Sequence, residues 1–218
     1  MGKQFGNGSS VTEVLTSDTV AKKIAKQKGM LINHKEIAIV GRSNCGKSSL
    51  INALVNEKVA IASKTPGRTQ QLIYHTLGFK SPFIVSLVDA PGYGFASAPD
   101  AELEKWKKLT SIYFSSSANL FRTIILLDSR RGMMGTDKML MDWLDTLDRQ
   151  YTICLTKADL ISDTKIKDSL NSIGDYIRDR PKCSDLILVT SSKYNYGIRE
   201  MTAYLSYTMV TNEMTQIK

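Results

Sequence analysis

The sequence lacks a long hydrophobic run, and no stretch approaches the roughly 18 consecutive apolar residues that a membrane-spanning helix requires. It contains only three cysteines, Cys45, Cys154 and Cys183, and none of them has a CxxC spacing. An odd number of isolated cysteines argues against a disulfide framework or a zinc site and fits a reducing compartment. The first residues also lack an apolar signal segment, and Gly6 stands where a myristoylation signal needs Ser or Thr. We therefore expect neither a membrane span nor secretion nor a lipid anchor.

Negative charge is also less frequent than positive charge: the 218 residues include 21 Asp and Glu but 29 Lys and Arg, which gives a formal net charge of +8. Positive charge favours a polyanionic partner, since binding phosphates releases condensed counterions. We expect RNA or a ribonucleoprotein as the partner, with no DNA specificity; the alternative is a surface charge that only keeps the protein soluble. The length fits one domain, and we expect a monomer.

Residues 1–34 are polar and irregular, with lysines but no arginine. We interpret them as a mobile leader that contains a short basic helix, followed by one domain at residues 35–210 and a C-terminal tail at residues 211–218. An organellar presequence is usually rich in arginine, which this leader lacks. The expected location is the cytoplasm, or an organelle matrix if the source is eukaryotic.

From Glu36 onward, short apolar runs alternate with longer amphipathic stretches. Runs too short for a helix and rich in β-branched residues predict buried strands at residues 37–40, 72–77, 83–88, 123–127, 151–155 and 186–189. The longer stretches predict helices at residues 48–55, 101–114, 137–147, 163–178 and 198–208. This alternation predicts the α/β class, with a mostly parallel six-stranded sheet covered by helices on both faces.

The first strand runs directly into the sequence GRSNCGKS, and a helix follows. This is the GxxxxGK[ST] pattern in its required context of strand, loop and helix, and it predicts a phosphate-binding P-loop. Lys47 should reach the β- and γ-phosphates, and the Ser48 hydroxyl should bind Mg²⁺. The residues expected to line the phosphates are Gly41, Arg42, Ser43, Asn44, Cys45, Gly46, Lys47, Ser48 and Ser49.

Two loops after later strands predict that the base is guanine. Asp159 in the sequence TKAD can accept from guanine N1–H and the N2 amino group, whereas adenine would leave the carboxylate unpaired. Alone this is weak, since Asp after a strand is often a helix cap. A second loop, TSSK, follows the last strand and should place a backbone amide at guanine O6. The expected base contacts are Thr156, Lys157, Ala158, Asp159, Thr190, Ser191 and Ser192.

Two further segments predict contacts with the γ-phosphate and the metal ion. The sequence DAPG matches DxxG, in which Asp89 should hold Mg²⁺ through water and the Gly92 amide should reach the γ-phosphate. Thr69 is the expected second hydroxyl ligand of Mg²⁺, with Thr65 as the alternative. The nucleotide-contacting residues expected in these two segments are Gly67, Arg68, Thr69, Gln70, Asp89, Ala90, Pro91 and Gly92.

Taken together, the segments GRSNCGKSSLINAL, KTPGRTQ, DAPGYGF, LLDSRRG, MLMDWL and LTKAD closely resemble the EngB family of Era-like GTPases over about residues 36–208. The resemblance implies a three-layer αβα P-loop NTPase fold of the Ras-like kind that binds GTP with Mg²⁺. It also implies a role in assembly of the large ribosomal subunit, with links to cell division and septation. Cys45 replaces the more usual Ala, and Ala90 the more usual Leu; neither side chain is expected to contact phosphate.

We expect slow GTP hydrolysis, because Tyr93 stands directly after DxxG where Ras-like enzymes carry a water-positioning Gln. No residue is assigned as catalytic with certainty: Lys47 and Thr69 should support the transition state, and Asn44 is a candidate ligand of K⁺. The basic residues Lys105, Lys107, Lys108, Arg130 and Arg131 are candidate RNA contacts, with a solvated surface as the alternative.

The sequence thus predicts a GTP-dependent molecular switch in assembly of the large ribosomal subunit. The alternative is a GTP-regulated protein-binding module in cell division, septation or organelle maintenance. A tRNA-modifying enzyme is disfavoured, because neither an appended domain nor a cysteine cluster is present.

Overall fold

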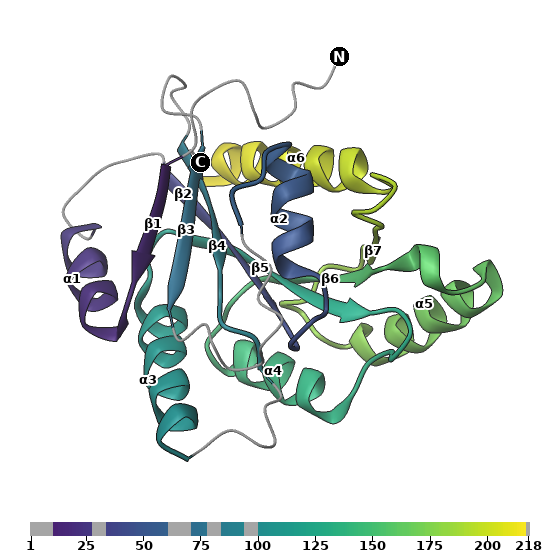
Figure 1. The fold of residues 1–218 in the computed structure, drawn as a ribbon, viewed down its shortest axis with the longest axis horizontal. Helices are drawn as coiled ribbons and strands as arrows, with labels where there is room; N and C mark the ends of the chain where they lie inside the picture. Colours follow the sequence, from purple (N-terminus) through teal and green to yellow (C-terminus); the bar gives the residue numbers. More distant parts are fainter. Residues whose placement is uncertain (1–10, 28–33, 61–70, 78–83, 94–99, 217–218) are drawn as a thin grey trace.

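A computed structural model describes residues 11–27, 34–60, 71–77, 84–93 and 100–216 (Figure 1). Its sheet has the strand order β1-β3-β4-β2-β5-β6-β7. The strands are β1 (Val11–Leu15), β2 (His34–Gly41), β3 (Leu72–Leu77), β4 (Ile84–Asp89), β5 (Leu120–Asp128), β6 (Tyr151–Thr156) and β7 (Leu188–Val189). The helices are α1 (Ser17–Gln27), α2 (Lys47–Val55), α3 (Asp100–Ser116), α4 (Gly135–Thr146), α5 (Asp163–Ile177) and α6 (Ile198–Gln216).

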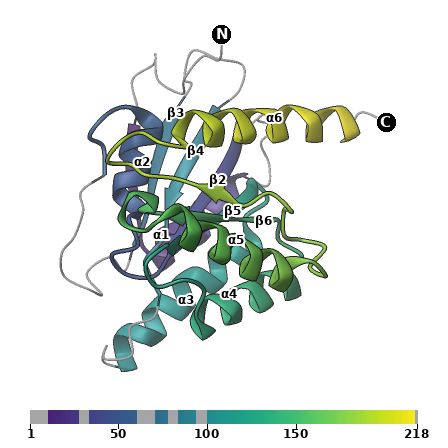
Figure 2. The ribbon, with the colours of Figure 1, turned by 90° about the vertical axis from the view of Figure 1, so that its right-hand side faces the viewer.

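The sheet is mostly parallel, as the sequence predicts. Strands β4, β2, β5, β6 and β7 run parallel to one another, whereas β3 is antiparallel to β4 and β1 is antiparallel to β3. The central strands β2 and β5 are buried on both faces because their apolar side chains alternate between two hydrophobic clusters. One cluster receives side chains of α1, α3, α4 and α5, and the other receives those of α2 and α6 (Figures 1 and 2). The predicted three-layer αβα architecture is confirmed.

The short basic helix expected in the leader is present as α1, but the structure differs from the prediction because residues 11–27 pack on the domain and begin with a strand. Residues Val11 to Leu15 form β1, which pairs with β3 in the register Val11↔Thr76 to Leu15↔Leu72. The following helix α1 buries Val20 and Ile24 in the cluster that α3 shares. The predicted count of six strands is therefore wrong, because β1 adds a seventh. This five-residue strand pairs with a strand about 60 residues later in the sequence, and no pattern within the segment itself predicts that pairing.

The C-terminal helix is longer than predicted. Helix α6 runs to Gln216, past the expected end at residue 208 and through most of the expected tail (Figure 2). No glycine or proline interrupts residues 198–216, so nothing in the sequence stops the helix. The Lys35 ammonium of β2 donates to the Met209 carbonyl at 2.7 Å, which fixes this part of the helix to the sheet.

In a parallel sheet the loops after the strands gather at one edge, where α/β proteins bind their ligands. The loops predicted to bind phosphate and base follow β2, β4, β6 and β7, and all four strands are parallel members of this sheet. Within the described ranges, no helix has both the length and the apolar character needed to cross a membrane.

Candidate functional site

The loop between β2 and α2 adopts the curled form of a phosphate-binding loop. Gly46 has φ 104° and Asn44 has φ 62°, both in the left-handed region, and at 104° an L side chain would be strained. Helix α2 begins at Lys47, so its positively polarised end follows the loop directly. The Lys47 ammonium donates to the Gly41 carbonyl at 3.3 Å and thus folds back over the loop.

The DxxG segment lies against this loop. A Cβ atom placed on Gly92 would stand 3.0 Å from Lys47 Nζ and 3.2 Å from the Gly41 carbonyl oxygen, so a side chain here would crowd the P-loop. The next residue, Tyr93, donates its backbone N–H to the same Gly41 carbonyl at 3.3 Å. The structure therefore brings the predicted γ-phosphate contact next to the predicted phosphate-binding lysine.

Asp89 ends β4 at the same edge of the sheet and is 7% exposed. Burial raises the pKa of its carboxyl group to about 6, although Lys47 opposes the shift. A buried carboxylate deprived of water, near a helix that begins with Lys47 and Ser48, fits a hard divalent cation, because Mg²⁺ prefers oxygen ligands. The predicted ligand Thr69 and its alternative Thr65 lie outside the described residues, as do Gly67, Arg68 and Gln70.

The base-reading loop after β6 is tied to the P-loop by Thr156. Its hydroxyl donates to the Cys45 carbonyl at 2.6 Å and lies 3.3 Å from the Leu127 carbonyl. Thr156 is 4% exposed, so these bonds form away from water. A threonine at the position where GTPases usually carry asparagine therefore still links the two loops.

The two loops predicted to read the base are also joined to each other. The Ser191 hydroxyl donates to the Asp159 carboxylate at 2.6 Å, and the Ala158 N–H donates to the Thr190 carbonyl at 3.1 Å. Asp159 lies in a short 3₁₀ helix at Ala158–Leu160, and its side chain is exposed. Ser191 therefore fixes one carboxylate oxygen of a side chain that is otherwise exposed.

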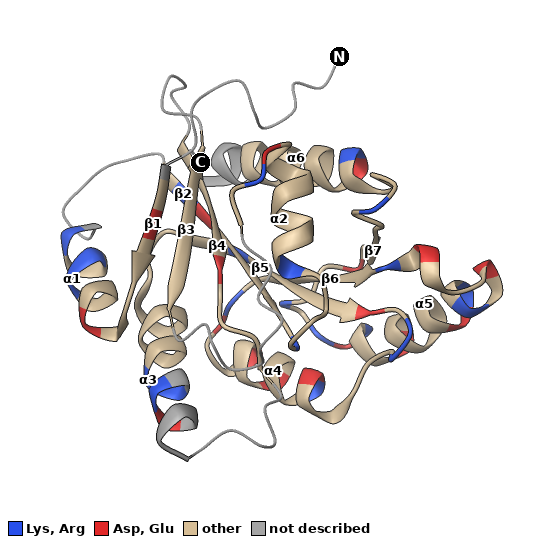
Figure 3. Cartoon of the chain, viewed as in Figure 1, with Lys and Arg blue, Asp and Glu red and all other residues tan. Residues whose placement is uncertain are grey.

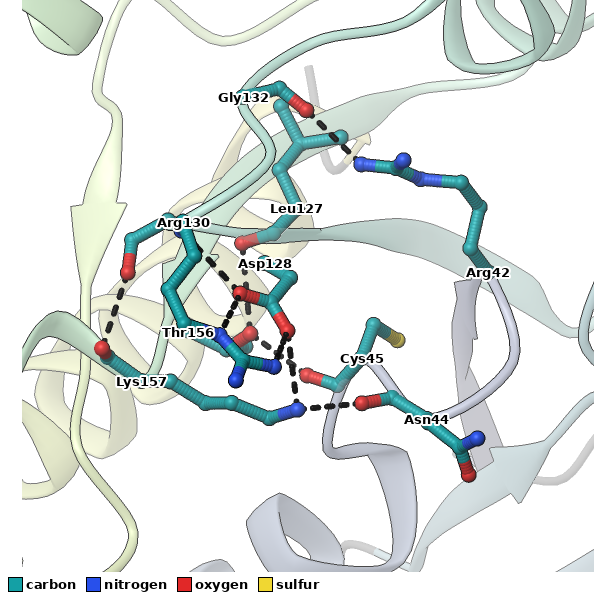
Figure 4. Close-up of polar contacts among 10 residues, drawn as sticks. Arg42, Asn44, Cys45, Leu127, Asp128, Arg130, Gly132, Thr156 and Lys157 are labelled. Atoms are coloured by element: carbon teal, nitrogen blue, oxygen red, sulfur yellow. Dashed lines mark hydrogen bonds and ion pairs between the residues drawn. The ribbon is translucent and has the colours of Figure 1, made fainter. Parts of the chain in front are cut away.

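A further carboxylate, which the sequence analysis missed, lies beneath the base-reading loop. Asp128 ends β5 and lies between two cations in Figure 4. Lys157 Nζ lies 2.9 Å from Asp128 Oδ2, and Arg130 makes a two-pronged contact of 2.9 Å to Oδ1 and 2.7 Å to Oδ2. Lys157 also donates to the carbonyl of Asn44 in the P-loop.

Burial disfavours ionisation of Asp128, but hydrogen bonds from Arg130 and Lys157 outweigh it and hold the pKa of the carboxyl group well below its usual range. One signal could have revealed this residue: Asp128 ends a predicted strand at the same edge as Asp89. Arg130, which the sequence analysis placed among candidate RNA contacts, therefore has its guanidinium engaged by a neighbouring carboxylate.

A second missed carboxylate, Asp137, lies in the first turn of α4 and contacts Arg42 of the P-loop. It is fully buried and accepts from the Tyr93 hydroxyl at 2.8 Å and from the Met134 N–H at 2.7 Å. Arg42 Nε lies 3.3 Å from Asp137 Oδ1, and another nitrogen of Arg42 donates to the Gly132 carbonyl at 2.8 Å (Figure 4). Burial, with Asp137 adding to it, raises the pKa of the Tyr93 phenol well above its ordinary value.

Charged residues of both signs are spread along the chain, and Lys and Arg occur on α1 and α3 (Figure 3). The candidate RNA contacts Lys105, Lys107 and Lys108 on α3 are exposed, and Lys107 pairs with Glu104 at 2.9 Å. A surface pair of this kind is weak, so it does not prevent Lys107 from meeting a stronger anion.

Comparison with known proteins bears on the family to which the chain belongs. The family described as "50S ribosome-binding GTPase" matches residues 36–157. A relative named "Probable GTP-binding protein EngB", from Nitrobacter hamburgensis, is 41% identical over 174 residues, which cover 78% of this chain and 78% of the relative.

Two solved structures share the fold. A crystal structure of a probable GTP-binding protein engB has a TM-score of 0.63 at 22% identity and covers 81% of this chain and 99% of that one. The structure of Era in complex with MgGDPNP and nucleotides 1506–1542 of 16S ribosomal RNA has a TM-score of 0.63 at 21% identity. That match covers 80% of this chain, and the chain spans only 56% of Era's length. Since one family profile covers more than half of the chain and the EngB relative aligns over most of its length, the chain belongs to the EngB family of GTP-binding proteins.

Proposed function

We propose that this protein binds GTP and GDP in the site formed by its P-loop, DxxG segment and base-reading loops, and that GTP binding switches it in assembly of the large ribosomal subunit. The observation that carries the proposal is the joining of these loops. Thr156 bonds to the P-loop, Ser191 bonds to Asp159, and Gly92 packs against Lys47. One ligand with phosphates at one end and guanine at the other suits such an arrangement.

At the phosphate end, the backbone N–H groups of residues 41–49 and the first turn of α2 cradle the phosphates. Lys47 turns from the Gly41 carbonyl, which it contacts at 3.3 Å, to the β- and γ-phosphates. Ala90 and Pro91 set the path of the chain from Asp89 to Gly92, whose N–H then meets the γ-phosphate.

Ser48 directly, Asp89 through water and Thr69 would hold Mg²⁺, and the ion would supply positive charge beside the β- and γ-phosphates. The burial that raises the pKa of Asp89 to about 6 suits this assignment, because a nearby cation would offset the lost hydration of the carboxylate. Residues Gly67, Arg68 and Gln70 belong with Thr69 to the segment that senses the γ-phosphate. The role of Asn44 as a ligand of K⁺ stays a prediction of the sequence.

At the base end, Asp159 accepts from both guanine N1–H and the amino group, and Ser191 keeps its carboxylate in place at 2.6 Å. Lys157 lays its stem along the base, while Thr156 and Ala158 fix the loop through their bonds to Cys45 and Thr190. The backbone of residues 190–192 supplies the amide for guanine O6. An adenine base would leave the Asp159 charge unpaired, which disfavours it by up to about 10⁴-fold.

Hydrolysis by this site is slow. The position after DxxG is occupied by Tyr93, whose hydroxyl is engaged by buried Asp137 at 2.8 Å and is therefore turned away from an attacking water. The raised pKa of the phenol also prevents Tyr93 from serving as a base near neutral pH. The protein thus holds its GTP-bound form until a partner accelerates turnover, as a switch requires.

The ribosomal role is supported by three observations. The matching family is described as ribosome-binding, the structurally similar Era is solved with ribosomal RNA, and the chain carries a net charge of +8. A cationic protein surface next to segments that sense the γ-phosphate would let the nucleotide state control binding to RNA.

The substitution Asp159→Asn tests both the specificity for guanine and the ribosomal partner. An amide at residue 159 can donate to the 2-carbonyl of xanthine but repels the 2-amino group of guanine, so the variant should lose GTP affinity by at least about 100-fold and gain affinity for XTP. Calorimetry with both nucleotides measures this exchange. Equal affinity of the wild-type protein for ATP and GTP would overturn the proposed specificity.

The same variant separates a ribosomal partner from other partners. Co-sedimentation with purified large subunits should require a non-hydrolysable GTP analogue for the wild-type protein and the matching xanthosine analogue for the variant. Failure of both proteins to sediment with large subunits, while nucleotide binding follows the expected exchange, would contradict the ribosomal role and favour a protein partner.

A further inference from the structure

The carboxylate of Asp128 lies where the base-reading loop crosses the P-loop. Its oxygen Oδ2 is 2.9 Å from Lys157 Nζ, and the same ammonium donates to the Asn44 carbonyl (Figure 4). The Asp128 side chain is only 5% exposed, whereas that of Lys157 is 27% exposed. A flexible lysine is thus held between a buried anion and the backbone of a loop more than 100 residues earlier in the sequence.

Ser129, the residue after Asp128, contacts the backbone of Lys157, whereas Asp128 contacts its side chain. The Ser129 hydroxyl donates to the Lys157 carbonyl at 2.9 Å, and the Ser129 N–H donates to the Thr156 carbonyl at 3.0 Å. Lys157 itself has φ 56°, a left-handed conformation that is uncommon for a residue with a side chain. Asp128 and Ser129, where β5 ends, therefore fix both the ammonium and the backbone carbonyl of Lys157.

Arg130 supplies the second cation. Its guanidinium contacts both oxygens of Asp128, and its side chain is 48% exposed. Such a two-pronged contact fixes the plane of a carboxylate, because the guanidinium presents its donors in a rigid fork. Arg130 therefore orients Asp128, and it shares the oxygen Oδ2 with Lys157.

We propose that Asp128 is a positioning residue for guanine nucleotide: it holds the Lys157 ammonium at the Asn44 carbonyl and so fixes the base-reading loop relative to the P-loop. This role rests on the function proposed above. Without the carboxylate, the four-carbon stem of Lys157 gains rotational freedom, and ordering it again on each binding event costs affinity.

Because Asp128 acts at the base end of the site, its loss should weaken GTP and GDP binding equally. The ratio of the two affinities and the single-turnover hydrolysis rate of bound GTP should stay within about twofold of wild type, so that KM changes while kcat does not. A carboxylate that only stabilised the fold would lower the melting temperature without a specific loss of nucleotide affinity.

A double-mutant cycle tests the proposal with GDP as the probe. Asp128→Asn should raise the Kd for GDP about tenfold in the wild-type background and less than about twofold in a Lys157→Met background, because Asp128 acts through that lysine. Asp175→Asn is the matched control: it removes a carboxylate from another Asp–Arg pair, which is exposed on α5, and it should leave the Kd unchanged.

Two results would overturn the proposal: a folded Asp128→Asn variant that binds GDP like wild type, or an equal loss of affinity in both backgrounds. If the Asn variant does not fold, Asp128→Glu tests the same role, because it keeps the negative charge beside Lys157. It should restore GDP binding to within about threefold of wild type, and a loss as large as that of Lys157→Met would count against the role. A wild-type protein that binds no guanine nucleotide would instead refute the function itself, so the two failures are distinguishable.

Discussion

Two carboxylates, Asp137 and Asp128, contact residues that join the P-loop to other loops, and they lie in different surroundings. Asp137 is fully buried and has partners, Tyr93 and Arg42, that are each only 7% exposed. Asp128 is nearly as buried, but its partners Lys157 and Arg130 reach solvent, with side chains 27% and 48% exposed. The first connects the P-loop to the residue after DxxG, and the second connects it to the base-reading loop.

This difference separates stability from ligand affinity. When a substitution removes a buried carboxylate, its buried polar partners lose their hydrogen bonds, and the whole fold is destabilised. A carboxylate with half-exposed partners leaves groups that water can solvate, so its loss affects mainly the geometry of the loops. We therefore expect the contacts of Asp137 to affect mainly the free energy of unfolding. The contacts of Asp128 should affect mainly nucleotide affinity.

The largest effect is expected for Asp137→Ala. It leaves Arg42 with its charge buried and uncompensated and removes the acceptor of the Tyr93 hydroxyl, so the free energy of unfolding should fall by about 3–5 kcal/mol. Urea denaturation of the nucleotide-free protein measures this loss. Asp142→Ala on the same helix removes a 60% exposed carboxylate paired with Arg180 and should cost less than about 1 kcal/mol. Similar losses in the two variants would contradict the comparison.

A smaller effect is expected for Tyr93→Phe. The variant keeps the ring but removes one hydrogen bond to a buried carboxylate, so stability should fall by about 1.5–3 kcal/mol. Single-turnover GTP hydrolysis should remain within about threefold of wild type, because the hydroxyl faces Asp137 and not the nucleotide. Loss of hydrolysis without loss of stability would instead place Tyr93 in the catalytic machinery.

The smallest effect is the stability change of Asp128→Asn, which should be less than about 1 kcal/mol near neutral pH. The pKa of Asp128 is lowered in the folded protein, so its contribution is present above the unfolded value of about 3.9 and is lost as pH falls toward the folded value. The difference between wild type and variant should thus be constant from about pH 8 to pH 5 and shrink below about pH 4. A difference that shrinks already between pH 7 and pH 5 would show that Asp128 is not held ionised by its two cations.

The sequence was most informative where chemistry is encoded in contiguous residues. The P-loop at residues 41–48 and the TKAD loop at residues 156–159 combine a fixed spacing with a strand end, and the structure brings both to one edge of the sheet. It was least informative where a contact joins distant segments. Tyr93 and Asp137 are 44 residues apart, and Lys157 and Asn44 are 113 apart, so neither pair produces a local pattern.

The same limit explains the error at the N-terminus. The segment Val11–Leu15 is too short to be distinguished from a polar leader, and only the antiparallel register with β3 defines it as a strand. Once that register exists, α1 is placed over the cluster that contains Tyr113 of α3, and its residues Val20 and Ile24 become core residues.

The N-terminal strand also determines how the protein can safely be shortened. A fragment that started at His34 would leave the backbone N–H and C=O groups of β3 that face β1 unpaired along residues 72–76 and would uncover the apolar surface beneath Val20 and Ile24. Unpaired strand edges of this kind recruit other chains, so such a fragment would tend to aggregate even though every predicted nucleotide-binding residue remained in it. The first strand therefore covers β3 and helps to fix α1 over the core, so a shortened protein should keep residues 11–27.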